Sequence, residues 1–167
     1  MKRKNERDKN TGTEAEIEVN KYLSIISLIV NRLNAQIKRH RIAEWIRNHN
    51  PTICCLQETH LKTKYLDRLK VKGWKKIYSK QMDKKKSQGS ILISDKIHFK
   101  TKTIKRDREG HFIVLKGRIY QEDINIVNIS APNIGAPKYI RKILEHFKKD
   151  IHSTTLIIGG FILHCTQ

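Results

Sequence analysis

Hydrophobic positions in the first third of the chain alternate between two kinds of run. Short apolar runs typical of buried strands occupy Tyr22 to Val30 and Thr52 to Leu56. Between them, Ile37 to Asn48 places its apolar residues on one face of a helix. This order of strand, helix and strand predicts a βαβ unit near the start of the ordered region.

The second half of the chain also predicts strands followed by a helix, and its strands are longer. Phe112 to Tyr120 and Ile124 to Ser130 alternate between apolar and polar residues, and the turn-like QED separates them. A loop rich in proline and glycine then opens a helix in APNIGAPKYIRKILEHFKKD, where Pro137 suits the first turn, and the strand TLIIGGFI follows. Strands with helices between some of them predict an α/β layered sandwich.

The first 21 residues differ from everything that follows, because they are polar and carry no hydrophobic period. We predict a disordered polar leader over residues 1–21 and one domain over residues 22–167. The leader segment KRKNERDK could serve in nuclear import, and an intracellular protein, nuclear or cytoplasmic, is expected. No apolar signal-peptide region is present, and the run YLSIISLIV is too short to cross a bilayer.

The formal net charge is +19, and it is unevenly placed. The first twenty residues balance five basic against five acidic side chains, so the excess lies in the domain. Such a charge favours a polyanion, nucleic acid first and an acidic membrane surface second, although a solvated lysine-rich surface is the alternative. The segment from Lys62 to Lys86 contains eleven Lys or Arg residues and only two acidic ones, Asp67 and Asp83. This excess of positive charge favours contact with phosphates or, equally, a solvated surface.

Three cysteines offer no disulfide framework or zinc pattern. Cys54 and Cys55 are neighbours on a predicted strand and should point to opposite faces as small apolar fillers, and Cys165 lies alone.

One carboxylate stands where a predicted apolar strand stops, in the segment CCLQETH. The carboxyl ends of strands in α/β proteins commonly hold ligands and catalytic groups, so Glu58 is a candidate for a metal or phosphate site. The alternative is an exposed residue that caps a following helix.

Several separate segments carry a family resemblance: LNAQIKRHRIAEWIRNHNPTICCLQETHLK, RLKVKGWKKIY, ILISDKIHFK, IKRDREGHFIVLKG, INIVNISAPNIGAPKYI and TTLIIGGF. Over roughly Leu23 to Phe161 the chain resembles the endonuclease domain of long interspersed element (non-LTR) retrotransposon polyproteins. That domain is a member of the endonuclease/exonuclease/phosphatase superfamily, with the apurinic endonucleases, exonuclease III and DNase I. The leader does not match.

The resemblance implies a DNase I-like four-layer α/β sandwich that hydrolyses DNA phosphodiesters with Mg²⁺. It implies DNA or RNA as partner through phosphate contacts, with neither a membrane nor a small-molecule substrate. The family continues to further strands and a Ser-Asp-His motif that this sequence lacks, so we expect a C-terminally truncated domain. His164 is more simply incidental than a replacement for that motif.

Two positions match the family's reaction centre, and four depart from it. Glu58 matches the metal-binding glutamate, with a catalytic role, and Asn133 matches a polar residue beside the phosphate.

The departures are substitutions of residues that the resemblance makes catalytic. Ile29 replaces an asparagine, Ser130 a tyrosine, Gly160 an aspartate and Ile162 a second asparagine. In addition, Arg32 stands where the family has a turn glycine, whose positive φ an arginine adopts at greater cost.

These departures remove the oriented base and most phosphate contacts, which each contribute factors of about 10² to 10⁴ in such enzymes. A single carboxylate also holds Mg²⁺ weakly. We therefore expect a catalytically impaired or inactive endonuclease relative. The alternatives are a non-specific basic nucleic-acid-binding remnant and a decayed fragment without a selected function.

Overall fold

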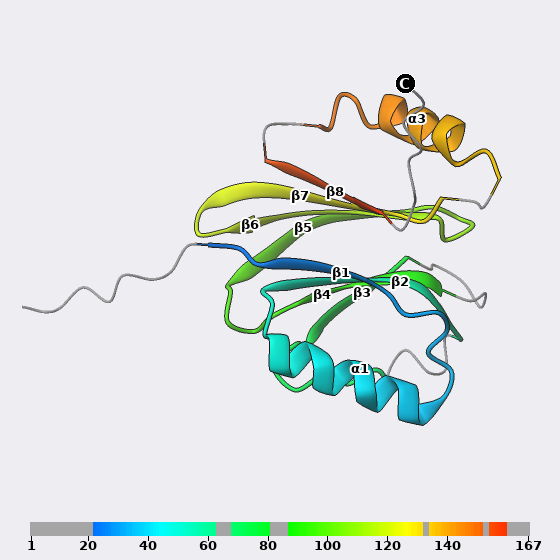
Figure 1. The fold of residues 1–167 in the computed structure, drawn as a ribbon. Helices are drawn as coiled ribbons and strands as arrows, with labels where there is room; N and C mark the ends of the chain where they lie inside the picture. The colour runs from blue at the N-terminus through cyan, green and yellow to red at the C-terminus, as the bar shows by residue number, and fades with distance from the viewer. Residues whose placement is uncertain (1–21, 63–67, 81–86, 132–133, 152–153, 160–167) are drawn as a thin grey trace, which may run out of the picture.

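Two four-stranded sheets lie face to face, and one helix covers the outer side of each sheet (Figure 1). The structure is a computed structural model, and it describes residues 22–62, 68–80, 87–131, 134–151 and 154–159. The predicted leader, residues 1–21, lies outside the described residues. The α/β four-layer arrangement expected from the sequence is confirmed.

The first sheet has the strand order β1-β2-β4-β3. Its elements are β1 (Ile25–Ile29), α1 (Gln36–His49), β2 (Ile53–Leu61), β3 (Lys76–Ser79) and β4 (Ser87–Ile93). Strands β1 and β2 are parallel, and α1 connects them, as the βαβ prediction requires. Strand β4 runs antiparallel to both β2 and β3.

The second sheet has the order β5-β6-β7-β8. Its elements are β5 (Phe99–Arg106), β6 (Phe112–Ile119), β7 (Glu122–Ile129), α3 (Ala136–His146) and β8 (Thr155–Gly159). Strands β5, β6 and β7 form an antiparallel meander, and α3 connects β7 to the parallel strand β8. Pro137 lies in the first turn of α3, as predicted.

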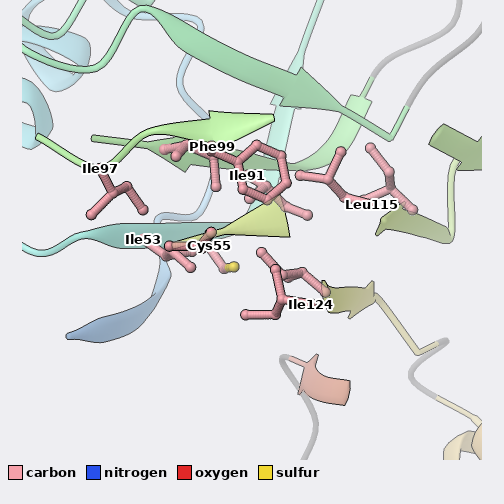
Figure 2. Close-up of a cluster of buried hydrophobic side chains, with 11 residues drawn as sticks. Ile53, Cys55, Ile91, Ile97, Phe99, Leu115 and Ile124 are labelled. Carbon is pink, nitrogen blue, oxygen red and sulfur yellow. The ribbon is translucent and has the colours of Figure 1, made fainter. Parts of the chain in front are cut away.

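A buried apolar cluster between the two sheets forms the centre of the domain (Figure 2). The first sheet contributes side chains from β2 and β4, and the second contributes side chains from β5, β6 and β7. The fully buried members are Ile53, Cys55, Ile91, Ile93, Ile113, Leu115 and Ile126. Removal of this apolar area from water is the main force that holds the sheets together.

Each sheet also packs against its helix through a smaller apolar cluster, one under α1 and one under α3. Cys54 packs in the cluster under α1, whereas Cys55 packs between the sheets, so the predicted opposite orientations are confirmed. Trp74 is 4% exposed in the α1 cluster, and Tyr78 packs against the central cluster. These two aromatic side chains of the basic stretch therefore support the core and are not presented to a ligand.

Three details differ from the sequence prediction. Strand β2 does not stop at Leu56 but continues to Leu61. The β6–β7 turn is the pair Tyr120 and Gln121, both with positive φ, so only the first residue of QED lies in the turn and its two acids lie in β7. Strand β5 carries so many lysines that its sequence gave no strand signal.

Candidate functional site

Glu58 lies inside β2, in an irregular part of the strand between Gln57 and Leu61 where the pairing with β4 shifts register. Its side chain is exposed, and its backbone has φ 54°. The expectation that Glu58 follows the end of a strand is therefore wrong, because the bulged strand continues past it. The alternative as a helix cap is also wrong, since Glu58 is followed by strand residues.

The loop after β1 is held against this bulge by its backbone. Arg32 N–H donates to the Glu58 carbonyl at 2.8 Å, and Leu33 N–H donates to the Thr59 carbonyl at 2.8 Å. Four residues here have left-handed backbones without being glycine: Asn31, Arg32, Glu58 and His60. Such conformations are costly for side chains with a Cβ, and they concentrate at functional sites.

The strain at Arg32 gives a direct prediction. Its φ is 67°, as expected where the family has a turn glycine. We expect Arg32→Gly to raise the free energy of unfolding by about 0.5 to 1 kcal/mol, because relief of the left-handed strain exceeds the entropic cost of glycine. Urea unfolding measures the change. Arg32→Ala is the matched control, because it removes the side chain but keeps the strain, and an equal gain in both variants would contradict the explanation.

Ile29 presents an apolar side chain at the position where the resemblance expects an active-site asparagine. It is 63% exposed and pairs in register with Gln57, the residue before Glu58. The substitution therefore places a hydrocarbon next to Gln57, where it can neither bind a phosphate oxygen nor orient a water molecule.

Ser130, at the family's tyrosine position, takes part in a polar cluster between the sheets. Lys80 is 0% exposed, and its Nζ donates to Ser130 Oγ at 2.6 Å and to Gln57 Oε1 at 3.1 Å. Ser130 Oγ also donates to Gln57 Oε1 at 3.3 Å. Burial lowers the pKa of Lys80 from its ordinary 10.5 to about 7.

The polar cluster also involves residues of β7 and β4. Gln57 Nε2 donates to Asn128 Oδ1 at 2.5 Å, which links β2 to β7. Gly89 on β4 leaves room for the lysine, because a Cβ there would lie 2.9 Å from Lys80 Cε and 2.7 Å from the Leu56 carbonyl oxygen. The inter-sheet layer thus changes from apolar to polar at the end of the domain that carries Glu58.

Sequence reasoning missed Lys80, Gln57 and Asn128. The available signal was the alternation of β3, because Lys80 is two residues after the inward-facing Tyr78 and so continues the same face. This signal was easily overlooked, because Lys80 is one of eleven basic residues between Lys62 and Lys86.

The other predicted site residues lie outside the described residues: Asn133, Gly160 and Ile162. Two of the substituted positions are described, and both lie at Gln57. Ile29 pairs in register with Gln57, and Ser130 Oγ donates a hydrogen bond to its side chain.

A Mg²⁺ site does not follow from the donors that the structure describes. Within the described ranges, no group of three or more His, Cys, Asp or Glu side chains could hold a metal ion. Glu58 supplies one exposed carboxylate, and the Gln57 and Ser130 oxygens already accept hydrogen bonds from the Lys80 amine. Because Mg²⁺ needs several fixed oxygen ligands and a negative environment, these residues do not fit the expected cofactor.

Four exposed lysines lie in the segment between β2 and β3. Lys62 follows β2 directly, and Lys70, Lys72 and Lys75 lie exposed on the way to β3. In the part of the chain that the structure describes, none of these four forms an ion pair with a carboxylate. Their charge is therefore available to an anionic partner. Among the described helices, none is long and apolar enough to cross a membrane.

Comparison with known proteins gives a family match and many structural relatives. The model of the Endonuclease/Exonuclease/phosphatase family matches residues 30–154. A structure of D. rerio TDP2 complexed with single strand DNA product is similar with TM-score 0.63 at 14% identity, over 82% of this chain and 58% of that one.

Two further solved structures widen the range of relatives. The endonuclease domain of TRAS1, a telomere-specific non-LTR retrotransposon, has TM-score 0.57 at 10% identity, over 83% of this chain and 58% of that one. The mannosyl-6-phosphatase Bt3783 of Bacteroides thetaiotaomicron VPI-5482 has TM-score 0.61 at 15% identity, over 83% of this chain and 64% of that one. The chain thus spans about three fifths of the length of these structures, and the likeness concerns the fold.

Proposed function

Because the chain belongs to the endonuclease/exonuclease/phosphatase family, as its match over residues 30–154 shows, we propose that it binds the phosphates of nucleic acids while its Mg²⁺-dependent hydrolysis is impaired. The observation that carries the proposal is the set of exposed lysines Lys62, Lys70, Lys72 and Lys75, which form no ion pair with a carboxylate among the described residues. Their charge is independent of the substituted reaction centre.

The charge supports sequence-indifferent binding. A protein that meets several phosphates with lysines releases the same number of counterions, so its affinity falls steeply with salt. Phosphate contacts fix the position of the protein and read no sequence. Two relatives with this fold point to the same ligand class, because the D. rerio TDP2 structure holds single strand DNA product and the TRAS1 domain is an endonuclease.

The impairment rests on residue chemistry. Ile29 is apolar, Ser130 Oγ is occupied by Lys80, and Glu58 has no second carboxylate in a metal-binding group among the described residues. A family enzyme must hold the metal, activate water and stabilise the phosphate, and one exposed carboxylate cannot perform all three tasks.

The binding proposal predicts a local effect of charge. We expect the triple variant Lys70→Gln/Lys72→Gln/Lys75→Gln to lower the salt slope of log K for duplex DNA by about 2 to 3, since each lost phosphate contact contributes about 0.9. Fluorescence anisotropy over a salt series measures this slope. The matched control, Lys138→Gln/Lys142→Gln/Lys149→Gln, removes the same charge around α3. Equal slopes in both triple variants would attribute binding to net charge alone and overturn the assignment to this surface.

The impairment proposal predicts no Mg²⁺-dependent nicking. Supercoiled plasmid incubated with the chain and Mg²⁺ should be nicked no faster than with Glu58→Ala. Restoration of the expected family residues by Gly160→Asp/Ile162→Asn tests whether those substitutions limit the reaction. Nicking by the original chain that disappears in Glu58→Ala would show a working centre and refute the impairment.

A further inference from the structure

The two sides of the sandwich, where the edge strands of its sheets meet, differ in structure. On one side the edge strands are β3 and β5, and hydrogen bonds join them. Tyr78 Oη and Thr101 Oγ1 are 2.6 Å apart, and Arg106 Nε donates to the Ser79 carbonyl at 2.7 Å. On the other side the edge strands are β1 and β8 (Figure 1).

A hollow of about 540 Å³ lies between β1 and β8. The first sheet lines it from the start of β1, and the second sheet lines it from the β6–β7 turn and the start of β8. Its apolar lining consists of Leu23, Ile25, Ile119, Ile124 and Leu156. These side chains belong to the central cluster or pack against it, so the hollow borders the core. Its volume is in the range of small-molecule sites, about 300 to 1,000 Å³.

The charged residues that line the hollow in the described part of the chain are acids, Glu122 and Asp123. Asp123 is already paired, with Lys102 at 2.7 Å and with Arg118 at 2.9 Å. Glu122 is exposed and takes part in none of the ion pairs between described residues. Its carboxylate is therefore available to a cation beside an apolar surface.

Tyr120 adds an aromatic ring to the same lining. It is 36% exposed, and it lies two residues before Glu122 in the strained β6–β7 turn, with φ 47°. The face of an aromatic ring attracts an ammonium group, so the ring and the carboxylate favour the same ligand charge. Thr154 and Thr155 also line the hollow, and a hydroxyl oxygen can accept an N–H bond.

From this geometry we propose that the hollow binds a small organic amine, whose apolar body fills it and whose ammonium group lies between Glu122 and Tyr120. The net charge of +19 attracts anions to the molecule as a whole. Salt screens exposed lysines beyond about 8 Å, whereas Glu122 would act at contact distance. The site lies at the opposite end of β1 from Ile29 and of β7 from Ser130, so it is separate from the candidate site at Glu58.

The test compares octylamine with octanoate on the full chain. The two probes share an apolar tail, and at neutral pH the amine is a cation and the carboxylate an anion. We expect octylamine to shift the methyl resonances of Leu23, Ile25 and Leu156 and to bind more tightly than octanoate at these residues. Titration followed by methyl NMR measures both affinities, and the same spectra show whether a variant is folded.

Two variants separate the charged part of the site from the apolar part. Glu122→Gln should weaken octylamine about 2- to 5-fold, as expected for one exposed ion pair, and should not weaken octanoate. Glu44→Gln is the matched control, because Glu44 is an exposed acid on α1. Leu23→Trp fills the hollow from a half-buried position and should abolish binding of octylamine.

Three results would overturn the proposal. Equal affinity for the two probes, or an equal loss in Glu122→Gln and Glu44→Gln, would remove recognition of the ammonium group. Unshifted lining methyls would remove the site, and Overhauser contacts from Leu156 to residues before Tyr22 or after Gly159 would then identify the chain's own ends as the occupant. None of these results bears on DNA binding, which rests on lysines between β2 and β3.

Discussion

Replacement of Lys80 by methionine should raise the free energy of unfolding by about 3 kcal/mol at pH 7. The pKa of Lys80 falls from 10.5 to about 7 on folding, which corresponds to a destabilisation of about 4 kcal/mol at that pH. Methionine has a similar length, carries no charge and adapts to irregular cavities, so it fits the same space.

The gain is reduced by the hydrogen bonds that Lys80 makes. Ser130 and Gln57 lose their shared partner, but they keep their own bond at 3.3 Å, so the loss is about 1 kcal/mol. Replacement of a buried ionic group by an apolar one of similar size commonly stabilises a protein for this reason.

Urea unfolding of Lys80→Met, with the exposed Lys96→Met as control, measures this difference. The control should change stability by less than about 0.5 kcal/mol, as surface substitutions usually do. If Lys80→Met were less stable than the original chain, the amine would be a net stabilising element, and its lowered pKa would need another cause.

The strongly apolar strands were predictable, and the polar edge strand was not. Strands β6 and β7 are rich in apolar residues because both of their faces are buried, one against the first sheet and the other under α3. In β5, Phe99 is buried and Ile104 half-buried, while three lysines, two threonines and one arginine fill the other positions. A strand at the edge of a sheet tolerates such a sequence, since only one side of it pairs.

The turn between β6 and β7 shows a second limit. Two-residue turns with positive φ favour Asn, Asp and Gly, whereas Tyr120 and Gln121 fill both positions here. The register, which pairs Ile119 with Glu122, is set by burial of the flanking apolar residues and imposes the strained turn. Local turn chemistry therefore placed the turn one residue too late.

The candidate site was predictable in part, for a different reason. Glu58 and the substituted positions follow from the resemblance, and Arg32 has the strained backbone that a lost glycine implies. The Lys80 cluster contradicts residue preference, because lysine is almost never fully buried. Only the fold brings Gln57, Lys80 and Ser130 together from separate strands.

Stability should pass through a maximum near pH 9 as pH is raised from 7. Between pH 7 and 10.5 the unfolded chain holds a proton on Lys80 that the folded chain has lost, so stability rises by up to about 1.4 kcal/mol per pH unit. Burial raises the pKa values of Cys54 and Cys55 from 9.0 to about 12. Above pH 9 the unfolded thiols therefore lose protons that the folded thiols keep, and stability falls by up to the same amount for each.

The three groups together fix the shape of the curve. Lys80 dominates below pH 9, and its effect less the early loss from the thiols gives a gain of about 1 to 2 kcal/mol between pH 7 and 9. Above that pH the two thiols outweigh it, and Tyr139, whose pKa burial raises from 10.0 to about 12, deepens the fall beyond pH 10. Urea midpoints under reducing conditions at each pH measure the curve. In Lys80→Met the rising limb should vanish while the fall remains, because the thiols are unchanged. A rising limb that persists in Lys80→Met would assign the pH dependence to other groups and would remove the buried amine as its cause.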